Sequence, residues 1–199
     1  MQYIITECKK INKGRVDIVL DGRIRFWLYA GEARQLSLEE GKDISKEQYQ
    51  QILHGIIGKR AIKRAMHILE RQERTEYQLR EKLIQSAYPK EAVEEAVDYV
   101  RKFHYLDDER YARTFIRYHQ KERSKKRLEL DLMKRGVPKD TIKLCIEEEF
   151  ETDEKEQIRL LIEKKQYEKD AADQKERAKM YQFLARRGFS HSDIMSVLR

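Results

Sequence analysis

The sequence predicts a mainly α-helical protein in which three tandem three-helix repeats form an elongated, curved array, preceded by a small antiparallel β extension. Three observations lead to this fold class. An apolar pattern occurs three times at nearly constant spacing, and each copy contains residues typical of a tight turn between two helices. A different pattern, in which apolar and polar residues alternate, is confined to residues 1–44 and predicts strands.

The repeated pattern is clearest around Gly136, which suits the left-handed residue that ends a helix. Leu128 and Leu132 before it lie four residues apart, on one helical face, and Pro138 after it fits the start of the next helix. The six matching positions are Leu128, Leu132, Gly136, Val137, Ile142 and Ile146; then, 49 residues earlier, Leu79, Leu83, Ala87, Tyr88, Val93 and Val97; and, 52 residues later, Met180, Leu184, Gly188, Phe189, Ile194 and Leu198. Each copy is too small to bury its apolar face alone, which is typical of stacked repeats.

Two alternating runs near the N-terminus, 16–20 and 24–28, flank Asp21-Gly22. This dipeptide favours a two-residue hairpin turn, in which both residues take positive φ. We expect a further strand over Tyr3–Cys8 and a short fourth strand at Gln35–Leu38. So small a sheet is expected to depend on the helices for stability.

A linking helix is expected over residues 45–58, opened by Ser45 with Gln48 at the capping-box position. Gly55 and Gly58 weaken its end, so we expect a bend or break there. Three three-helix repeats then follow, at 59–105, 106–151 and 152–199, giving nine helices. The expected helix caps are Thr75 (with Gln78), Asp107 or Asp108, Ser124, Thr152 or Asp153, and Ser190, with a looser joint near Asp170–Asp173.

Charged residues make up 40% of the chain, against about 25% in an ordinary globular protein. The formal net charge of +7 favours an acidic partner, either nucleic acid or an acidic protein filament. The sequence contains neither a signal-peptide pattern nor a run of about 20 apolar residues, so we expect a soluble, cytoplasmic protein without a membrane partner. A monomer is also expected. Cys8 and Cys145 lack metal or redox spacing, and Cys145 is expected in the core.

The segment around Gly136 also matches the core of a DNA-reading helix-turn-helix. In that case the helix after Gly136 would enter the major groove, yet it exposes Glu147, Glu148 and Glu149. The corresponding helix of the first repeat exposes Glu91, Glu94, Glu95 and Asp98. Phosphate would repel such helices. We therefore interpret the pattern as a packing repeat.

Basic residues gather on the first and second helices of the repeats, whereas the third helices are acidic. Arg110, Arg113, Arg117 and Lys121 share one helical face at spacings of three, four and four residues. Such a charge run is often only a solvated face, but its one-sided placement favours a docking surface. The candidate interaction residues are Arg110, Arg113, Arg117, Lys121, Arg123, Lys125, Lys126, Arg127, Lys134, Arg135, Arg186 and Arg187.

The sequence gives little support for catalysis. Its five histidines have no partner at metal-ligand spacing, and His104 in FHYLDD is better interpreted as part of a turn before a helix. Neither a phosphate-binding glycine loop nor a serine-hydrolase or zinc-protease motif is present. We therefore expect a non-enzymatic protein with no cofactor and no metal.

From residue 59 onward the chain resembles the RecX family of bacterial recombinase regulators. The motifs that carry the resemblance are LERQERTEYQLREKL at 69–83, YLDDERYA at 105–112, LMKRGV at 132–137 and FLARRGFSHSDIMSVL at 183–198. Ala87-Tyr88 departs from the family pattern of glycine and an aliphatic residue, so a less tight turn is expected there. The N-terminal part is similar to an extension of RecX proteins from low-GC Gram-positive bacteria.

The resemblance implies a modulator of RecA in DNA repair, recombination and the SOS response. Family members are understood to lie along the groove of the RecA–DNA filament, to inhibit ATP hydrolysis and strand exchange, and to limit filament growth or promote disassembly. The expected partner is thus the RecA nucleoprotein filament. The alternative is a protein that binds single- or double-stranded DNA directly, through phosphate contacts that do not read sequence.

Overall fold

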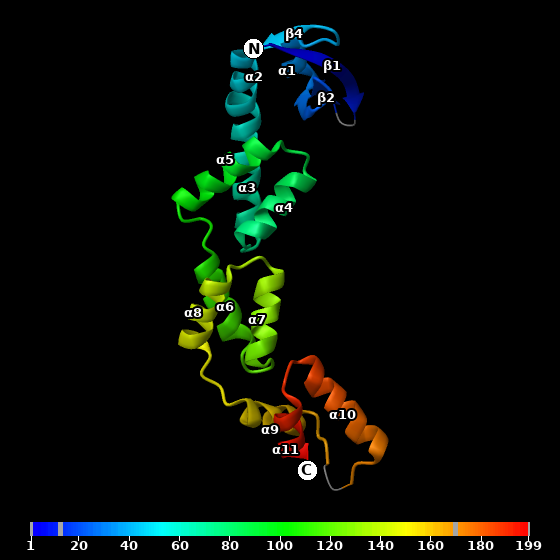
Figure 1. The fold of residues 1–199 in the computed structure, drawn as a ribbon, viewed down its shortest axis with the longest axis vertical. Helices are drawn as coiled ribbons and strands as arrows, with labels where there is room; N and C mark the ends of the chain where they lie inside the picture. The colour runs from blue at the N-terminus through cyan, green and yellow to red at the C-terminus, as the bar shows by residue number, and fades with distance from the viewer. Residues whose placement is uncertain (1, 12–13, 169–170, 199) are drawn as a thin grey trace. The chain divides into compact units, whose positions relative to one another are not determined.

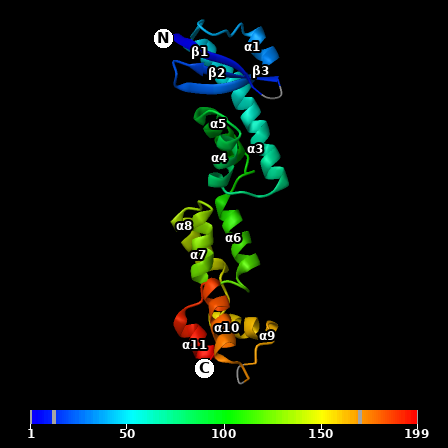
Figure 2. The ribbon, with the colours of Figure 1, turned by 90° about the vertical axis from the view of Figure 1, so that its right-hand side faces the viewer.

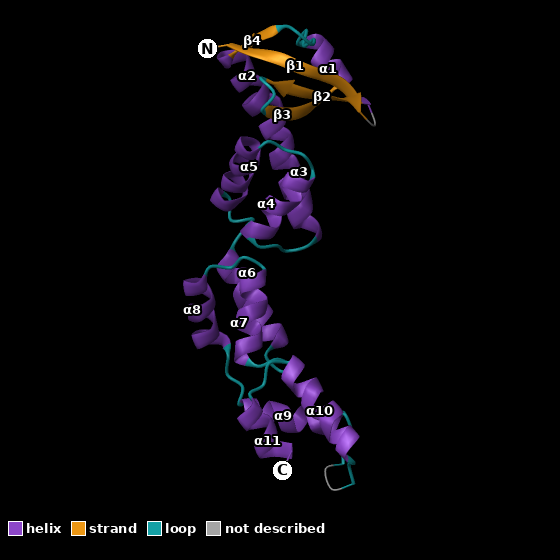
Figure 3. Cartoon of the chain, turned by 45° about the vertical axis from the view of Figure 1, so that its right-hand side comes forward, coloured by secondary structure: helices purple, strands orange, loops and turns teal. Residues whose placement is uncertain are grey.

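The computed structural model describes residues 2–11, 14–168 and 171–198 (Figure 1). The chain forms two compact units, Met1–Asp107 and Asp108–Arg199. All strands of the described residues belong to the first unit, and the second unit consists of helices and connecting loops (Figure 3).

The N-terminal sheet has four antiparallel strands in the order β3-β2-β1-β4. Asp21 and Gly22 join β2 to β3 with φ values of 49° and 65°, which confirms the predicted hairpin turn. The predicted first strand is also present, as β1. The strands are β1 (Gln2–Ile11), β2 (Arg15–Leu20), β3 (Ile24–Tyr29) and β4 (Asp43–Ser45).

The fourth strand lies elsewhere than expected, since the assignment of Gln35–Leu38 to a strand is wrong. A short helix, α1 (Ala30–Gln35), follows β3 directly, and Ser37 takes a positive φ of 52° in the turn behind it. The Glu32 carboxylate accepts a 2.8 Å hydrogen bond from the Tyr29 backbone N–H and thereby helps to open α1. The edge strand β4 pairs with β1 only after this helix and its turn.

A bend or break was expected at Gly55 and Gly58, and the structure has no break there. Helix α2 (Lys46–Ile52) opens at Ser45 with the predicted capping box and continues through a π-helical segment, Leu53–Gly58, into α3 (Lys59–Arg71). A π-helical turn adds a residue to the helical path without ending it. The two glycines are therefore accommodated in a widened turn of one continuous helical run.

The sheet and the first repeat share one core, as expected for so small a sheet. Phe26 and Leu28 of β3 are buried in the same cluster as Leu53 and Ile57. Trp27 Nε1 donates a 3.4 Å hydrogen bond to the Ser86 carbonyl oxygen in the first repeat. The extension thus packs onto the repeat.

Nine helices follow Gly58 in the described residues, in three groups of three, as predicted. The first and third helices of each group are in extensive contact, and Figure 2 shows α4 and α5 beside α3. After α3 they are α4 (Glu76–Gln85), α5 (Lys90–Lys102), α6 (Asp108–His119), α7 (Lys125–Lys134), α8 (Lys139–Glu149), α9 (Glu154–Lys164), α10 (Gln174–Arg186) and α11 (His191–Leu198).

The turn between the second and third helices has the same conformation in all three repeats. Ala87, Gly136 and Gly188 take φ values of 60°, 80° and 88°. In each turn this residue donates its backbone N–H to the carbonyl oxygen three residues earlier, at 2.8, 2.9 and 3.0 Å. The expectation of a less tight turn at Ala87 is therefore wrong, and Ala87 bears the strain of a left-handed conformation.

Most predicted caps are present. Thr75 and Ser124 accept hydrogen bonds from the backbone N–H groups of Gln78 (3.2 Å) and Arg127 (3.2 Å). Asp153 caps α9, and Ser190 Oγ accepts the Asp193 N–H at 3.0 Å. Of the predicted loose joint, Asp170 lies outside the described residues, whereas Asp173 caps α10. Cys145 is fully buried in the core of the second repeat, as predicted.

Candidate functional site

The basic face predicted on the first helix of the second repeat meets the acidic end of the third helix. Arg113 on α6 forms ion pairs with Glu109 (2.7 Å), Glu149 (3.1 Å) and Glu148. Arg117 Nη2 donates to Glu149 Oε1 at 2.7 Å. The expectation that cations and carboxylates lie on separate sides is therefore wrong for Arg113 and Arg117, because α6 packs against α8.

These ion pairs shift the pKa values of both partners. The hydrogen bond from Arg117 is the largest cause that lowers the pKa of Glu149; burial opposes it, and the hydrogen bond from Arg113 adds to the lowering. Hydrogen bonds to Glu109, Glu148 and Glu149 raise the pKa of Arg113. Both groups remain charged at neutral pH, so the pairs persist there and much of the charge on this part of α6 is balanced within the chain.

The basic residues that follow α6 divide into side chains with and without an ion pair. They are Arg123, Lys125, Lys126 and Arg127. Arg123 Nη1 and Arg127 Nε both donate to Asp131 Oδ2, at 2.9 and 3.1 Å. The Asp131 side chain is only 7% exposed, so it is a buried anchor for two arginines that each remain partly exposed. Lys125 and Lys126 are exposed, and neither side chain has an ion pair with any residue that the structure describes.

Arg135 and Lys134, at the end of α7, differ in the same way. The Arg135 guanidinium donates to Tyr111 Oη at 3.1 Å and to the Asp131 carbonyl oxygen at 2.8 Å, and lies 4.5 Å from the Phe115 ring centroid. It thus holds α7 against α6. Lys134 is exposed, as are Arg110 and Lys121 near the two ends of the predicted face.

Arg186 and Arg187, from the end of α10, lie beside the start of α7. Together with Arg123 and Arg127 they line a cavity of about 250 Å³, and Glu122 is the one further lining residue in the described part of the chain. The sequence identified both arginine pairs as candidates, but they are about sixty residues apart and nothing in their spacing brings them together. The packing of the third repeat on the second is responsible.

That packing places the N-terminus of α7 against two segments of the third repeat. The Ser124 backbone N–H donates to the Arg187 carbonyl oxygen at 3.1 Å, and the Lys125 N–H donates to Glu154 Oε1 at 2.8 Å. A Cβ atom on Gly188 would lie 2.5 Å from Ser124 Oγ and 2.6 Å from Arg127 Cβ, so only glycine fits there. Burial raises the pKa of Glu154, while its bond to Lys125 opposes that shift.

A second set of contacts joins the same two repeats through glutamine side chains. Gln157 is completely buried at the start of α9, and its Nε2 donates to the Gln120 carbonyl oxygen. Gln120 Oε1 in turn accepts the Glu151 backbone N–H at 3.1 Å and the Thr152 hydroxyl at 3.2 Å. The relative position of the two repeats is therefore set by hydrogen bonds at two separate places.

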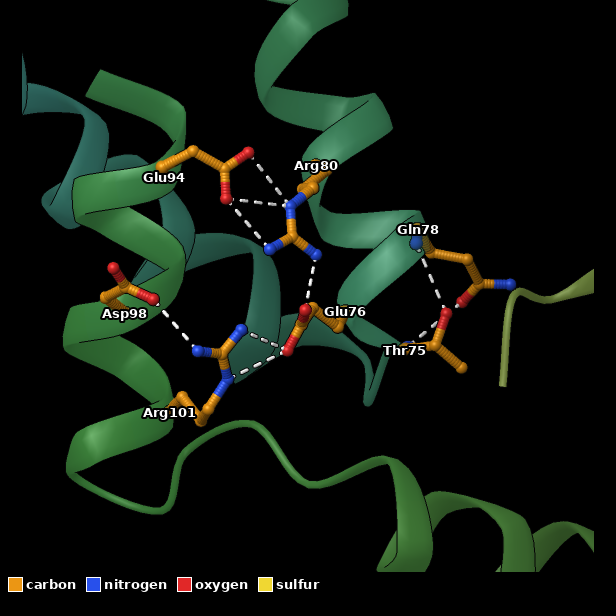
Figure 4. Close-up of polar contacts among 7 residues, drawn as sticks. All are labelled: Thr75, Glu76, Gln78, Arg80, Glu94, Asp98 and Arg101. Atoms are coloured by element: carbon orange, nitrogen blue, oxygen red, sulfur yellow. Dashed lines mark hydrogen bonds and ion pairs between the residues drawn. The ribbon is translucent and has the colours of Figure 1, made fainter. Parts of the chain in front are cut away.

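The first repeat carries an ion-pair network that sequence reasoning did not identify (Figure 4). Arg80 on α4 bonds to Glu94 on α5 at 2.8 Å, and it also pairs with Glu76 at 2.5 Å. Arg101 donates to Glu76 at 2.6 Å and to Asp98 at 2.9 Å. The sequence offered two local signals, the i,i+4 spacing of Glu76 and Arg80 and the i,i+3 spacing of Asp98 and Arg101. The pairs of Arg80 with Glu94 and of Arg101 with Glu76 require α4 and α5 to pack together.

This network is structural in character. Burial alone would raise the pKa of Glu76, but hydrogen bonds from Arg80 and Arg101 outweigh it and lower the pKa. Hydrogen bonds to Glu94 and Glu76 raise the pKa of Arg80. Arg80 is therefore paired with carboxylates from two helices, Glu76 on α4 and Glu94 on α5. In the first repeat, as in the second, acidic residues of the third helix pair with arginines on neighbouring helices of the same repeat.

No helix in the described part of the chain is both long and apolar enough to span a bilayer. Among the same residues, His, Cys, Asp and Glu side chains form no group of three or more that could hold a metal ion. Cys8 and Cys145 are both free thiols.

Family models for RecX match the three groups of helices. The first three-helix domain matches residues 61–99, the second matches 107–144 and the third matches 152–198. A regulatory protein RecX from Caldanaerobacter subterraneus subsp. tengcongensis is 33% identical over 192 residues, which cover 96% of this chain and 95% of that protein. One from Clostridium botulinum strain Alaska E43 is 30% identical over 97% of this chain and 92% of its own.

Two solved structures have a similar fold. A crystal structure of a regulatory protein RecX covers 98% of both chains with a TM-score of 0.60 and 23% identity. RecX from Lactobacillus salivarius covers 71% of this chain and 94% of its own, with a TM-score of 0.58 and 21% identity.

Proposed function

Because the chain belongs to the RecX family of regulatory proteins, we propose that it binds the RecA–DNA filament in the cytoplasm and inhibits the recombinase and ATPase activity of RecA. The observation that carries the proposal is the similarity to a regulatory protein RecX over 96% of this chain. The protein would act by binding, as a monomer without a cofactor, and it would take part in DNA repair and recombination.

The cations most suited to such a contact are those that the chain leaves without an internal partner. Lys121, Lys125, Lys126, Lys134 and Arg186 have exposed side chains, and none forms an ion pair with a residue that the structure describes. Arg113 and Arg117 are less suited, because Glu149 already holds them. The proposed surface is therefore centred on the end of α6, on α7 and on the end of α10.

Several moderate contacts along repeats can add through effective concentration, so that no single cation has to supply the affinity. An acidic protein surface or a phosphate backbone would attract the same cations. Filament binding differs from naked DNA binding in one measurable respect. A protein–protein contact has an apolar component that persists in salt, whereas affinity dominated by phosphate contacts falls steeply as salt rises.

The direct test is a RecA ATPase assay on single-stranded DNA, with the protein added either before or after filament assembly. We expect inhibition in at least one order of addition. Inhibition only before assembly indicates blocked growth, and inhibition in both orders indicates disassembly or inhibition of the complete filament. A lack of inhibition in both orders contradicts the proposal.

A charge-reversal set tests the surface. Lys121→Glu, Lys125→Glu and Lys126→Glu together should weaken inhibition about fivefold or more if each lysine contributes a few tenths to one kcal/mol. The matched control is Lys139→Glu, Lys143→Glu and Lys155→Glu, which changes three exposed lysines of the same unit outside the candidate set. Equal effects of the two triples would remove this surface from the proposal.

The second candidate function is direct DNA binding without sequence preference. The cavity lined by four arginines favours it, because guanidinium groups form paired hydrogen bonds with phosphate oxygens. Binding of the protein to naked DNA between 50 and 200 mM salt separates the two candidates: a loss of roughly a thousandfold or more is expected only if phosphate contacts dominate.

A further inference from the structure

The cavity between the second and third repeats gathers positive charge that the chain does not balance. Its lining residues are Arg123, Arg127, Arg186, Arg187 and Glu122, so four guanidinium groups and one carboxylate give a formal charge of +3. Glu122 also pairs with Lys164 at 3.2 Å. Behind the lining, Asp131 is the one carboxylate of the described residues that bonds to any of these four arginines.

The arginines are held in place by contacts that leave N–H groups for a ligand. Asp131 accepts hydrogen bonds from Arg123 Nη1 and Arg127 Nε. The remaining guanidinium nitrogens of Arg123 and Arg127 have no hydrogen bond to a described residue. The Arg187 guanidinium carbon lies 3.8 Å from the Phe183 ring centroid, a cation–π contact that fixes the plane of its fork. Arg186 has neither a hydrogen bond nor an ion pair from its side chain to any described residue.

The backbone around the cavity is also fixed. The bond from the Ser124 N–H to the Arg187 carbonyl oxygen, 3.1 Å long, ties the first turn of α7 to the end of α10. The close approach of Gly188 to Ser124 and Arg127 leaves no room for this joint to shift. The like charges are therefore brought together by the fold before any ligand arrives, and an anion that enters relieves their repulsion.

A second hollow adjoins the first along α10. It has a volume of about 330 Å³, shares Arg186 and Arg187 with the first cavity, and adds Lys179, Gln182 and Phe183. Because the two hollows adjoin and share two arginines, they are better suited to a ligand with two neighbouring anionic groups than to a single isolated ion. Phosphates linked through oxygen have this arrangement, and the planar fork of arginine binds their oxygens in pairs.

We infer that these two adjoining hollows form a binding site for linked phosphate groups. The ligand is either the sugar–phosphate backbone of a nucleic-acid strand or a free polyphosphate. Arg186 and Arg187 bind a phosphate at the point common to both hollows, and Arg123 and Arg127 bind its neighbour. The inference locates the phosphate contacts of the proposed function, but it does not require RecA, so its test is carried out without RecA.

The test measures binding of two probes, inorganic tripolyphosphate and a short oligothymidylate, to the full chain by calorimetry. Arg186→Gln is the principal variant, because its side chain is exposed and unbonded in the described structure, so the fold should be retained. The matched control is Arg71→Gln, which removes an exposed arginine in the last turn of α3. We expect Arg186→Gln to weaken binding about tenfold or more, as for a lost charge-assisted hydrogen bond, and Arg71→Gln to change it less than about twofold.

The outcomes distinguish the two sources of phosphate. If both probes bind and Arg186→Gln weakens both, the site takes linked phosphates of either kind. If only one probe shows this behaviour, that probe identifies the source. If neither probe binds, or if Arg186→Gln and Arg71→Gln have the same effect on both, the inference is wrong.

A RecA ATPase assay with Arg186→Gln shows whether a failure concerns the phosphate site or the proposed function. Loss of phosphate binding with unchanged RecA inhibition supports the phosphate site but contradicts the placement of Arg186 in the inhibitory contact. Failure of the wild-type protein to inhibit RecA, with phosphate binding intact, contradicts only the proposed function.

Discussion

Ser124 and Arg187 are joined by a main-chain hydrogen bond of 3.1 Å, from the backbone N–H of the first to the carbonyl oxygen of the second. Ser124 is also the cap of α7, and its side chain accepts the Arg127 N–H. One buried residue therefore both starts a helix and holds the turn of the next repeat. This joint and the glutamine contacts between the same repeats bring the four arginines of the cavity together.

The joint makes Gly188 irreplaceable. Gly188→Ala combines a left-handed φ of 88° with a Cβ placed 2.5 Å from Ser124 Oγ. We expect a loss of about 2–5 kcal/mol in the free energy of unfolding, measured by urea denaturation with hydrogen exchange to locate the affected helices.

The control for this substitution is Gly41→Ala, because Gly41 has a similar φ of 84° but nothing within 4 Å of an added Cβ. It should lose only the backbone contribution of about 1–2 kcal/mol. Equal losses at the two positions would show that the close approach to Ser124 has no energetic weight.

Ala87 offers the opposite change. It occupies the same turn position with a φ of 60°, where an L side chain costs about 1–2 kcal/mol. Ala87→Gly removes that cost but adds about 0.4–1 kcal/mol of unfolded-chain entropy, so a net gain of about 0.5–1 kcal/mol is expected in urea unfolding. Ala178→Gly, at an exposed position in the interior of α10, should instead lose about 1 kcal/mol. Destabilisation by Ala87→Gly would mean that the turn is not strained.

Asp131 is expected to contribute to stability through its two arginines. Its side chain is 7% exposed and accepts hydrogen bonds from Arg123 and Arg127. Asp131→Asn removes the negative charge and replaces one buried acceptor oxygen by an NH₂ donor. A loss of about 1–3 kcal/mol should follow, measured by thermal or urea unfolding. The control Glu147→Gln changes an exposed carboxylate on α8 and should stay within about 0.5 kcal/mol. If Asp131→Asn behaves like the control, the buried acceptor is dispensable.

His119 predicts a pH dependence. Burial, followed by repulsion from Arg123 and Arg135, lowers its pKa, while Asp131 and Glu122 oppose the shift only partly. Between this lowered pKa and the unfolded value of about 6.5, the unfolded chain binds more protons than the folded chain. The free energy of unfolding should therefore fall as pH drops through that window.

The measurement is a series of urea unfolding curves from pH 5 to 7 for the wild type and His119→Gln. The variant loses the ring contact with Phe115, 4.4 Å between centroids, and should be less stable at every pH. Its stability should nevertheless vary less with pH than that of the wild type. Parallel curves would show that His119 does not titrate differently on folding.

The sequence by itself determined the elements that depend on local chemistry. Asp21-Gly22 predicted a turn with two positive φ values, Ser45 with Gln48 predicted a capping box, and the triple apolar pattern predicted three helical groups. Each of these follows from residues close together in the chain. Even where local reasoning failed, at Gly55 and Gly58, a π-helical turn absorbed the residues that were expected to break the helix.

Only the tertiary structure decided which charges remain available. Spacing along α6 placed Arg113 and Arg117 on a basic face, but the packing of α8 on α6 brings Glu149 to both. The packing of the third repeat on the second assembles Arg123, Arg127, Arg186 and Arg187 around one cavity. A charge's partners depend on distances in space, and helical periodicity gives those distances only within one helix.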